Sequence, residues 1–321
     1  MAELQAQREV WASTLVELAQ RYPKLVVLDG DLANSTRAEV FEAAYPDRFL
    51  EMGIAEQNMM GVAAGLATLG FVPWLSSFAV FLAKRSLDQL RQVVAQPNLN
   101  VKLAGHYSGL MTARTGKTHQ SVEDIAVMRA MPHMKVVAPA DGIETRQAIQ
   151  AIMEDASPTY LRLIRDPLPN VFGDDYRFEL GKATVVRDGR DVTIITTGAQ
   201  LLRALDGAEE LSRGGIEAHV LHVPTIKPLD EDAIVSAADR TGLVVTTEEH
   251  SIIGGLGGAV AEVLGERRPT LMKRHGLQDL YGESGSNEDL LEKYGLTGRH
   301  VAETCRALIA SGRPDRAPAA R

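Results

Sequence analysis

The sequence has a single cysteine, Cys305, and neither a dense basic cluster nor a long hydrophobic run. One thiol cannot form an internal disulfide, so we expect a reducing compartment, namely the cytoplasm. There are 34 Lys and Arg against 42 Asp and Glu, and this net charge of -8 argues against a nucleic-acid partner. No apolar run approaches the ~20 residues of a membrane span, and the polar first ten residues do not resemble a secretory signal.

What the chain does contain is 321 residues, 45% of them hydrophobic, which suffices for two domains with full cores. Short apolar runs typical of buried strands alternate with helical stretches through most of the chain. This alternation predicts an α/β protein with two doubly wound domains, each built on a mainly parallel sheet. We place the domains at residues 1–170 and 180–312, with a linker at 166–175 and a flexible tail at 313–321.

One stretch, residues 48–67, organises the rest. A short strand reaches Gly53, and a helix begins with Glu56 in its first turn. The following residues, 61–67, are small and apolar, which is typical of a closely packed helix. Glu56 is either an acid that favours the helix dipole and faces solvent, or a buried carboxylate. A buried carboxylate needs a partner or takes up a proton, and no cation lies nearby in the sequence.

The segment Gly53-Ile54-Ala55-Glu56-Gln57-Asn58-Met59 resembles the Gly-Ile-x-Glu-x-x-Met element of transketolases and their thiamine-diphosphate relatives. In that family the glutamate hydrogen-bonds a ring nitrogen of the cofactor's aminopyrimidine, which helps the cofactor lose its thiazolium proton. The resemblance implies a pyrimidine-binding domain followed by a transketolase C-terminal domain. It also implies that Glu56 activates thiamine diphosphate, while the cofactor itself carries the chemistry.

Residues 106–120 form a long loop, and such loops often carry function. A phosphate-binding loop is excluded, because Met111 stands where that motif requires glycine. Gly116-Lys117-Thr118-His119-Gln120 instead resembles the Gly-Pro-Thr-His-Gln element of transketolases. By itself, a lone loop histidine is usually solvated or structural. The resemblance implies that His119 donates and accepts protons near the cofactor, a role for which imidazole is suited.

Phe78 and Phe81 lie three residues apart, so we expect both rings on one helix face. Ordinary core packing would explain this spacing. The resemblance implies instead that Phe81 stacks on the cofactor's pyrimidine ring with Phe78 beside it. Asp31 resembles the family aspartate that lies close to the thiazolium side.

Substrate phosphate would need fixed donors. Transketolases use an arginine in the first helix, a serine after the first strand, a histidine opening the long loop, and an arginine after the domain's last strand. By position these resemble Arg8, Ser35, His106 and Arg165. Each has another interpretation: Arg8 as a surface residue, Ser35 as a helix cap, and Arg165 as a partner of Asp166. The spacing from His106 to His119 differs by one residue from the family pattern.

Two replacements distinguish the loop from the family's. Transketolases usually have Glu-Asp-Gly before Pro-Thr-His, where this chain has Arg114-Thr115-Gly116 and then Lys117. The family aspartate reads the stereochemistry of sugar hydroxyls. Its absence, with two added cations, indicates a different or more anionic substrate.

The resemblance covers residues 8–310 but only the second half of a full transketolase. The segment that holds the cofactor's diphosphate and a divalent metal, Gly-Asp-Gly ending in asparagine, has no counterpart here. We therefore expect no metal site in this chain. The resemblance implies that an N-terminal partner subunit holds Mg²⁺ or Ca²⁺ and meets the helix over 61–67. We expect two such pairs to form an α2β2 heterotetramer. The glycine-rich 254–258 lacks the downstream acid of a dinucleotide site.

Three hypotheses follow. The first is the C-terminal subunit of a split transketolase, which transfers a two-carbon ketol unit between sugar phosphates. The second is a related thiamine enzyme, either similar to deoxyxylulose-phosphate synthase or to the beta subunit of a 2-oxo acid dehydrogenase. The third is a non-catalytic scaffold subunit, against which the presence of both Glu56 and His119 argues.

Overall fold

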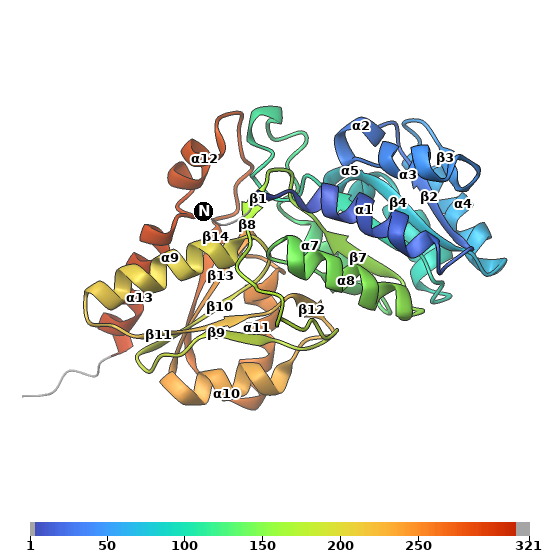
Figure 1. The fold of residues 1–321 in the computed structure, drawn as a ribbon. Helices are drawn as coiled ribbons and strands as arrows, with labels where there is room; N and C mark the ends of the chain where they lie inside the picture. The colour runs from blue at the N-terminus through green and yellow to red at the C-terminus, as the bar shows by residue number, and fades with distance from the viewer. Residues whose placement is uncertain (1–3, 313–321) are drawn as a thin grey trace, which may run out of the picture.

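The computed structural model describes residues 4–312, which contain two large sheets, each covered by helices on both faces, and one small two-stranded sheet (Figure 1). The expected tail at 313–321 lies outside the described residues. The α/β prediction with mainly parallel sheets is confirmed, since each large sheet has one antiparallel edge strand and is otherwise parallel. Within the described part of the chain, no helix has the length and apolar character needed to cross a membrane.

The first sheet has the strand order β12-β6-β7-β5-β4-β2-β3. Its strands are β2 (Leu25–Asp29), β3 (Phe49–Glu51), β4 (Val72–Phe78), β5 (Lys102–His106), β6 (Lys135–Val137), β7 (Thr159–Arg162) and β12 (Thr225–Lys227). Its helices are α1 (Gln7–Ala19), α2 (Ala33–Thr36), α3 (Glu39–Ala44), α4 (Glu56–Thr68), α5 (Ala79–Arg85), α6 (Leu87–Gln89), α7 (Asp124–Arg129) and α8 (Gly142–Glu154), with short 3₁₀ turns at Pro46–Arg48 and Ala113–Thr115.

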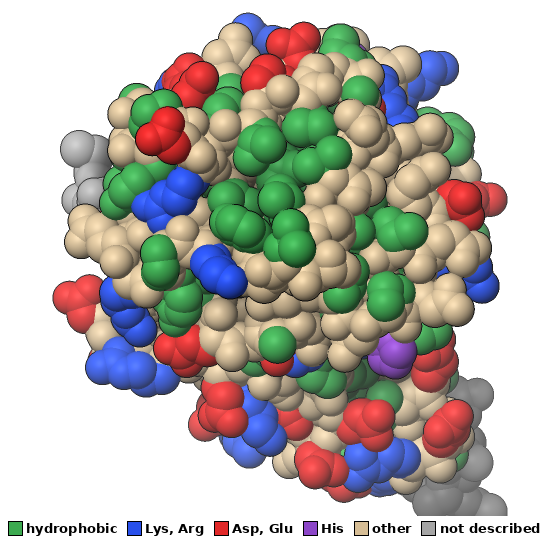
Figure 2. All heavy atoms as spheres, turned by 90° about the vertical axis from the view of Figure 1, so that its right-hand side faces the viewer, with side chains coloured by type: hydrophobic (Ala, Val, Ile, Leu, Met, Phe, Trp, Pro, Cys, Tyr) green, Lys and Arg blue, Asp and Glu red, His purple; other side chains and the backbone are tan. Residues whose placement is uncertain are grey.

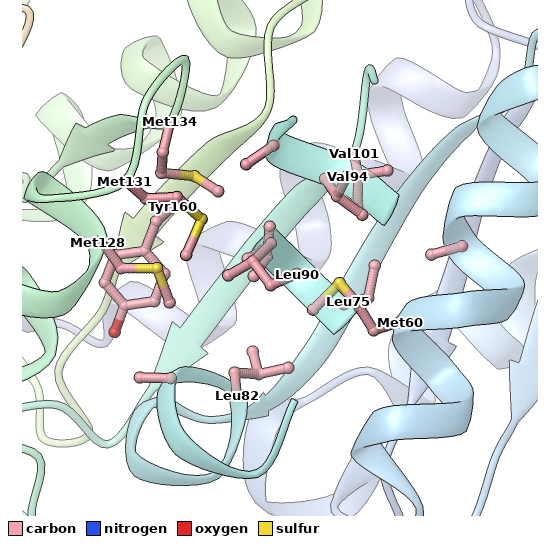
Figure 3. Packing of buried hydrophobic residues seen from close by; sticks show 14 of the residues in the cluster. Met60, Leu75, Leu82, Leu90, Val94, Val101, Met128, Met131, Met134 and Tyr160 are labelled. Carbon is pink, nitrogen blue, oxygen red and sulfur yellow. The ribbon is translucent and has the colours of Figure 1, made fainter. Parts of the chain in front are cut away.

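The central strands are apolar on both sides because both faces of the sheet are covered. Along β2, Leu25 and Val27 pack with α1 and α8, whereas Val26 and Leu28 pack on the opposite side against α4. Figure 3 shows the core on the α4 side of the sheet, where Met60 of α4 and Met128 of α7 pack near Leu75 and Tyr160. A continuous apolar run in the sequence is therefore the signature of a strand buried between two helical layers.

The second sheet has the order β14-β13-β10-β11-β9. Its strands are β9 (Thr184–Arg187), β10 (Val192–Thr196), β11 (Ala218–His222), β13 (Leu243–Ser251) and β14 (Leu271–Leu277). Its helices are α9 (Gln200–Arg213), α10 (Glu231–Thr241), α11 (Leu256–Arg267), α12 (Asn287–Lys293) and α13 (Gly298–Gly312). One core lies under α9 and α13, and the other lies under α10 and α11.

Several elements differ from the sequence-based prediction. Phe78 and Phe81 were expected on one helix, but residues 78–95 contain the end of β4, then α5, α6 and a π-helical segment, Leu90–Ala95. The linker contains β8 (Leu168–Pro169), which pairs with β1 (Leu4–Gln5). Strand β12 leaves the second half of the chain to pair with β6 of the first sheet. These pairings are non-local, so no periodicity in the sequence indicates them.

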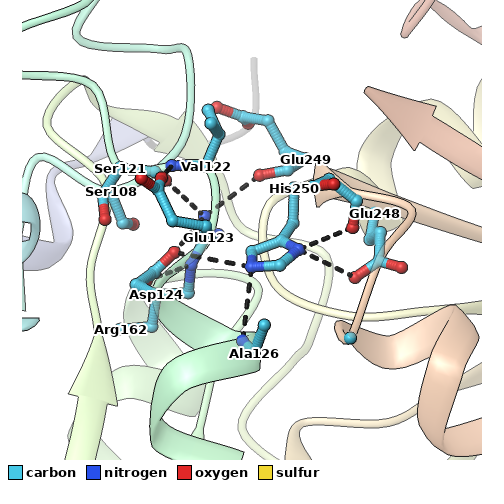
Figure 4. Close-up of polar contacts among 12 residues, drawn as sticks. Ser108, Ser121, Val122, Glu123, Asp124, Ala126, Arg162, Glu248, Glu249 and His250 are labelled. Atoms are coloured by element: carbon cyan, nitrogen blue, oxygen red, sulfur yellow. Dashed lines mark hydrogen bonds and ion pairs between the residues drawn. The ribbon is translucent and has the colours of Figure 1, made fainter. Parts of the chain in front are cut away.

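A buried polar network joins the two halves (Figure 4). The Asp124 carboxylate accepts hydrogen bonds from Arg162 Nε and from the Tyr160 hydroxyl, both at 2.8 Å. Arg162 Nη2 also donates to the carbonyl of Glu249, at 3.0 Å, on β13. Burial alone would raise the pKa of Asp124, but the Arg162 guanidinium holds that pKa below its usual value. The ion pair therefore fixes α7 and β7 against the second sheet.

Candidate active site

A hollow of about 340 Å³ opens at the carboxyl ends of neighbouring parallel strands, where open α/β sheets place their ligands. Each wall comes from the segment that follows one strand: the turn after β2, the start of α4 after β3, helix α5 after β4, and the loop after β5. The lining residues are Gly30, Asp31, Leu32, Ile54, Glu56, Phe81, Arg85, Thr118 and His119. The hollow is thus lined by four residues that the sequence predicted for the site: Asp31, Glu56, Phe81 and His119.

Glu56 is the first residue of α4, and its side chain is 3% exposed. Its carboxylate accepts a hydrogen bond from Arg85 Nη1 at 2.8 Å. The Arg85 guanidinium also lies over the ring of Phe81, 3.8 Å from its centroid. The solvent-facing interpretation of Glu56 is therefore wrong. A cation does lie beside it, although the sequence places that cation 29 residues away.

Helix α4 itself differs from the expectation of a helix buried on most faces. Glu56, Met59, Met60, Ala63 and Ala64 are buried. The opposite side is open to solvent, and a Cβ added at Gly61 or Gly65 would meet nothing within 4 Å. The small residues of this helix are therefore divided: Ala63 and Ala64 pack inward, and Gly61 and Gly65 line an exposed face.

The turn that carries Asp31 is held by two carboxylates. Asp29, whose pKa burial raises to about 6, accepts a hydrogen bond from the Leu32 N–H at 2.6 Å. Glu51 Oε1 accepts from the N–H of Asp31 at 3.0 Å and from that of Gly53 at 2.7 Å. Because Glu51 bonds both turns at once, it fixes Asp31 relative to the start of α4.

An aromatic row continues from the hollow. The His119 ring meets Phe78 and Phe81 edge to face, with centroids 5.8 and 5.4 Å apart, and Thr118 Oγ1 lies 2.9 Å from His119 Nδ1. The two phenylalanine rings stack at 5.7 Å, but they do not share a helix, because Phe78 is the last residue of β4 and only Phe81 lies in α5. Strand β4 continues as far as Phe78, so the two rings meet across the junction between β4 and α5.

Beyond Phe78 the row ends in two arginines. Tyr107 stacks on Phe78 with centroids 4.1 Å apart. Arg8 Nη1 donates to the Tyr107 hydroxyl at 3.0 Å and to the carbonyl of Ser35 at 2.8 Å. The Arg165 guanidinium carbon lies 5.4 Å from the Tyr107 centroid. The structure therefore gathers Arg8, Ser35 and Arg165, three of the four residues predicted to hold substrate phosphate.

The fourth, His106, is not brought to this surface. Its ring is fully buried, with its centroid 4.8 Å from that of Trp11, and burial together with the Arg8 charge lowers the pKa of His106 to about 3. As the last residue of β5, His106 points into the core, and the next residue, Tyr107, lies at the site instead. The one-residue difference in spacing was the sequence signal for this change.

The C-terminal domain holds the loop that carries His119. Glu249 Oε1 accepts hydrogen bonds from the N–H groups of Leu110 and Met111 at 2.7 and 2.9 Å. Ser284 Oγ donates to the carbonyl of Arg114 at 2.8 Å. Figure 1 shows this loop rising beside α12. Sequence reasoning missed Glu249, for which the only signal was a pair of acids inside an apolar strand, β13.

Two other potential binding features carry no ligand groups. At the glycine-rich turn before α11, the N–H groups of Leu256 and Gly257 already donate to the Glu248 carboxylate, at 2.7 and 2.8 Å. These two N–H groups are therefore not free to bind a nucleotide phosphate. Across residues 4–312, no group of three or more His, Cys, Asp or Glu side chains is placed to hold a metal ion.

Comparisons with known proteins match this architecture. Residues 4–170 match the transketolase pyrimidine-binding domain, and residues 181–301 match the transketolase C-terminal domain. A putative transketolase C-terminal section from Methanocaldococcus jannaschii is 43% identical over 92% of this chain and 94% of that protein. A 6-deoxy-6-sulfo-D-fructose transketolase subunit from Clostridium sp. is also 43% identical, over 92% of this chain and 91% of its own length.

A solved structure, described as a split gene transketolase in an inactive beta4 tetramer, superposes with a TM-score of 0.90. Its sequence is 47% identical, and the match covers 96% of this chain and 99% of that one. Both domains, the site geometry and these relatives agree. The chain belongs to the transketolase family, as a transferase-type enzyme subunit built from the pyrimidine-binding and C-terminal domains.

Proposed function

We propose that this chain is the C-terminal subunit of a split transketolase. With an N-terminal subunit it transfers a two-carbon ketol unit between sugar phosphates, using thiamine diphosphate and a divalent metal. The observation that carries the proposal is the Glu56 carboxylate, 3% exposed, in a hollow that it shares with Phe81 and His119. The names of the relatives support a transketolase over the other thiamine enzymes considered above.

The residues present fit the pyrimidine end of the cofactor. Glu56 offers a carboxylate acceptor to a protonated ring nitrogen, and Phe81 offers a flat face on which the ring stacks. When bound, thiamine diphosphate supplies the electron sink for breaking and forming the carbon–carbon bond. Glu56 holds a proton at the ring nitrogen, and the burial of its carboxylate strengthens that hydrogen bond.

The remaining residues act on the substrate. His119, 5.4 Å from Phe81 between ring centroids, accepts and returns the proton of a sugar hydroxyl. Arg8 and Arg165 donate to the phosphate at the far end of the aromatic row, and Ser35 fixes Arg8 through its carbonyl. Asp31, in the same hollow, would lie toward the thiazolium ring of a bound cofactor. The order along the row suits an extended sugar phosphate, with its reacting end near His119 and its charged end near Arg8.

The partner subunit is needed for the charged end of the cofactor. Among the described residues no metal-ligating cluster accompanies the hollow, and Mg²⁺ or Ca²⁺ requires several oxygen ligands. Figure 2 shows hydrophobic side chains gathered on the face of the first domain that carries α4. Ile54 and Leu69 are exposed there, beside the open glycines of α4. We assign the N-terminal subunit to this face, in an α2β2 assembly.

Cofactor binding by separated and mixed chains tests this assignment. Thiamine diphosphate with Mg²⁺ is titrated by calorimetry into this chain alone and into its mixture with the N-terminal subunit. We expect a Kd of about 1 mM or weaker for this chain alone, and a Kd at least about 100-fold lower for the mixture. The pair should also transfer ketol units and have the mass of two copies of each chain. Tight binding by this chain alone would contradict the split arrangement.

Arg85 gives a second test. Replacing it with alanine leaves the Glu56 carboxylate without its partner, so the free chain is expected to lose about 1–3 kcal/mol of stability. In the assembled pair with cofactor the loss should shrink, because the cofactor ring then hydrogen-bonds Glu56. Unfolding in denaturant, with and without partner and cofactor, measures both values. Arg91→Ala, at an exposed arginine on the same helical stretch, is the control and should change little. An equal loss in both states would contradict this role.

A further inference from the structure

Tyr107 stands at the end of the aromatic row, between Phe78 and the two arginines. Tyr107 is a non-glycine residue with φ of +57°, a conformation that costs free energy for most L-residues. It is 4% exposed, and its ring is stacked on Phe78. Such strain persists where the surrounding structure imposes it, and it is concentrated at functional sites.

The hydroxyl group of Tyr107 is oriented by its neighbour. Arg8 Nη1 donates to the phenolic oxygen at 3.0 Å, so the oxygen acts as an acceptor in that bond. Within residues 4–312, no acceptor for the phenolic hydrogen is present. Arg8 Nε and Arg165 Nε are also buried without hydrogen-bond partners in this part of the chain. The guanidinium carbons of Arg8 and Arg165 lie 5.9 and 5.4 Å from the centroid of the Tyr107 ring, and buried donors of this kind normally have an acceptor.

We propose that Tyr107 is the third donor of an anion clamp with Arg8 and Arg165, and that it binds the terminal phosphate or sulfonate of the sugar substrate. This proposal rests on the proposed function, and it identifies Tyr107 as a residue that helps the site select an anionic substrate. Two guanidinium groups supply the charge, and the phenol donates one neutral hydrogen bond to an oxygen of the same tetrahedral group.

The surroundings of the clamp favour an anion. His106, close to Arg8, is buried with both ring nitrogens unpartnered among the described residues, and burial lowers its pKa to about 3. The acid near the clamp is Asp166, whose Oδ1 lies 3.8 Å from Arg165 Nη1. Two guanidinium groups against one acid suit a phosphate or a sulfonate better than a neutral sugar hydroxyl.

Steady-state kinetics of the reconstituted pair test the clamp. Tyr107→Phe is expected to raise KM for a phosphorylated aldose acceptor about 10-fold with little change in kcat, because one hydrogen bond to a charged group is lost. With the same aldose lacking phosphate, the variant and the original chain should give equal KM values. Equal losses on both acceptors, or a fall in kcat alone, would show a merely structural role.

Direct anion binding separates this inference from the proposed function. Calorimetric titration of inorganic phosphate into the assembled pair should show binding that Tyr107→Phe weakens about 10-fold and Arg165→Ala weakens further. Thermal unfolding checks that each variant is folded. If the pair shows no ketol transfer but phosphate binding still depends on Tyr107, the clamp stands and the proposed reaction falls. If phosphate binds the Tyr107→Phe pair as tightly as the original, the clamp is wrong whatever the activity.

Discussion

Replacing Glu56 with alanine is expected to lower kcat of the reconstituted pair by about 10³-fold while the chain still folds and assembles. In the proposed function the Glu56 carboxylate holds a proton at the cofactor's ring nitrogen, so we expect its removal to stop activation of the cofactor. The fold tolerates the change because Arg85, then unpaired, is 43% exposed and can be solvated. Initial rates of ketol transfer, together with size-exclusion chromatography of the mixed subunits, measure both effects.

The control for this experiment is Glu42→Ala, which removes an exposed carboxylate from α3. Its activity should be unchanged. Glu56→Gln should lose nearly as much activity as the alanine variant, because a neutral amide cannot stabilise a protonated ring nitrogen. Full activity in the Glu56 variants would instead support the scaffold hypothesis, in which the partner carries out the reaction.

The largest stability effect is expected at the buried ion pair of Asp124 and Arg162, which lies within the first domain and from which Arg162 also reaches the second sheet. Asp124→Ala leaves the Arg162 guanidinium, only 5% exposed, without its counter-ion and removes the acceptor of the Tyr160 hydroxyl. Breaking a buried pair from one side typically costs about 3–5 kcal/mol. Urea unfolding, analysed with the slope held common to both chains, gives the free-energy difference.

An exposed pair provides the comparison. Arg299 and Glu303 lie one turn apart on α13, and each side chain is 49% exposed. Glu303→Ala should therefore change stability by no more than about 0.5 kcal/mol. The double variant Asp124→Leu with Arg162→Met should recover part of the loss, since no unpaired charge remains. A loss below about 1 kcal/mol for Asp124→Ala would mean that water reaches Arg162.

Local order was predictable from the sequence. The apolar run at Leu25–Asp29 indicated a strand covered on both faces, and Gly53 followed by Glu56 marked a strand-to-helix turn. The motifs around Glu56 and His119 pointed to the same family as the later comparisons. These features depend on residues within about one element of each other, where spacing and side-chain chemistry act directly.

Tertiary structure decided the features that join distant segments. Arg85 reaches Glu56 only because α5 packs beside the start of α4, and Glu249 reaches the long loop only because the second sheet packs against the first. The direction of His106 and Tyr107 depends on where β5 ends, and a change of one residue there exchanges the buried side chain for the one at the site.

The sequence by itself determined the fold class, the family and which acidic and imidazole groups stand at strand ends, because hydrophobic periodicity and local motifs encode them. Only the folded chain decided which charges meet, which side chain of a neighbouring pair faces the substrate end, and which helix face stays open. Those outcomes depend on packing between elements that are far apart in the chain, and no local sequence pattern predicts such packing.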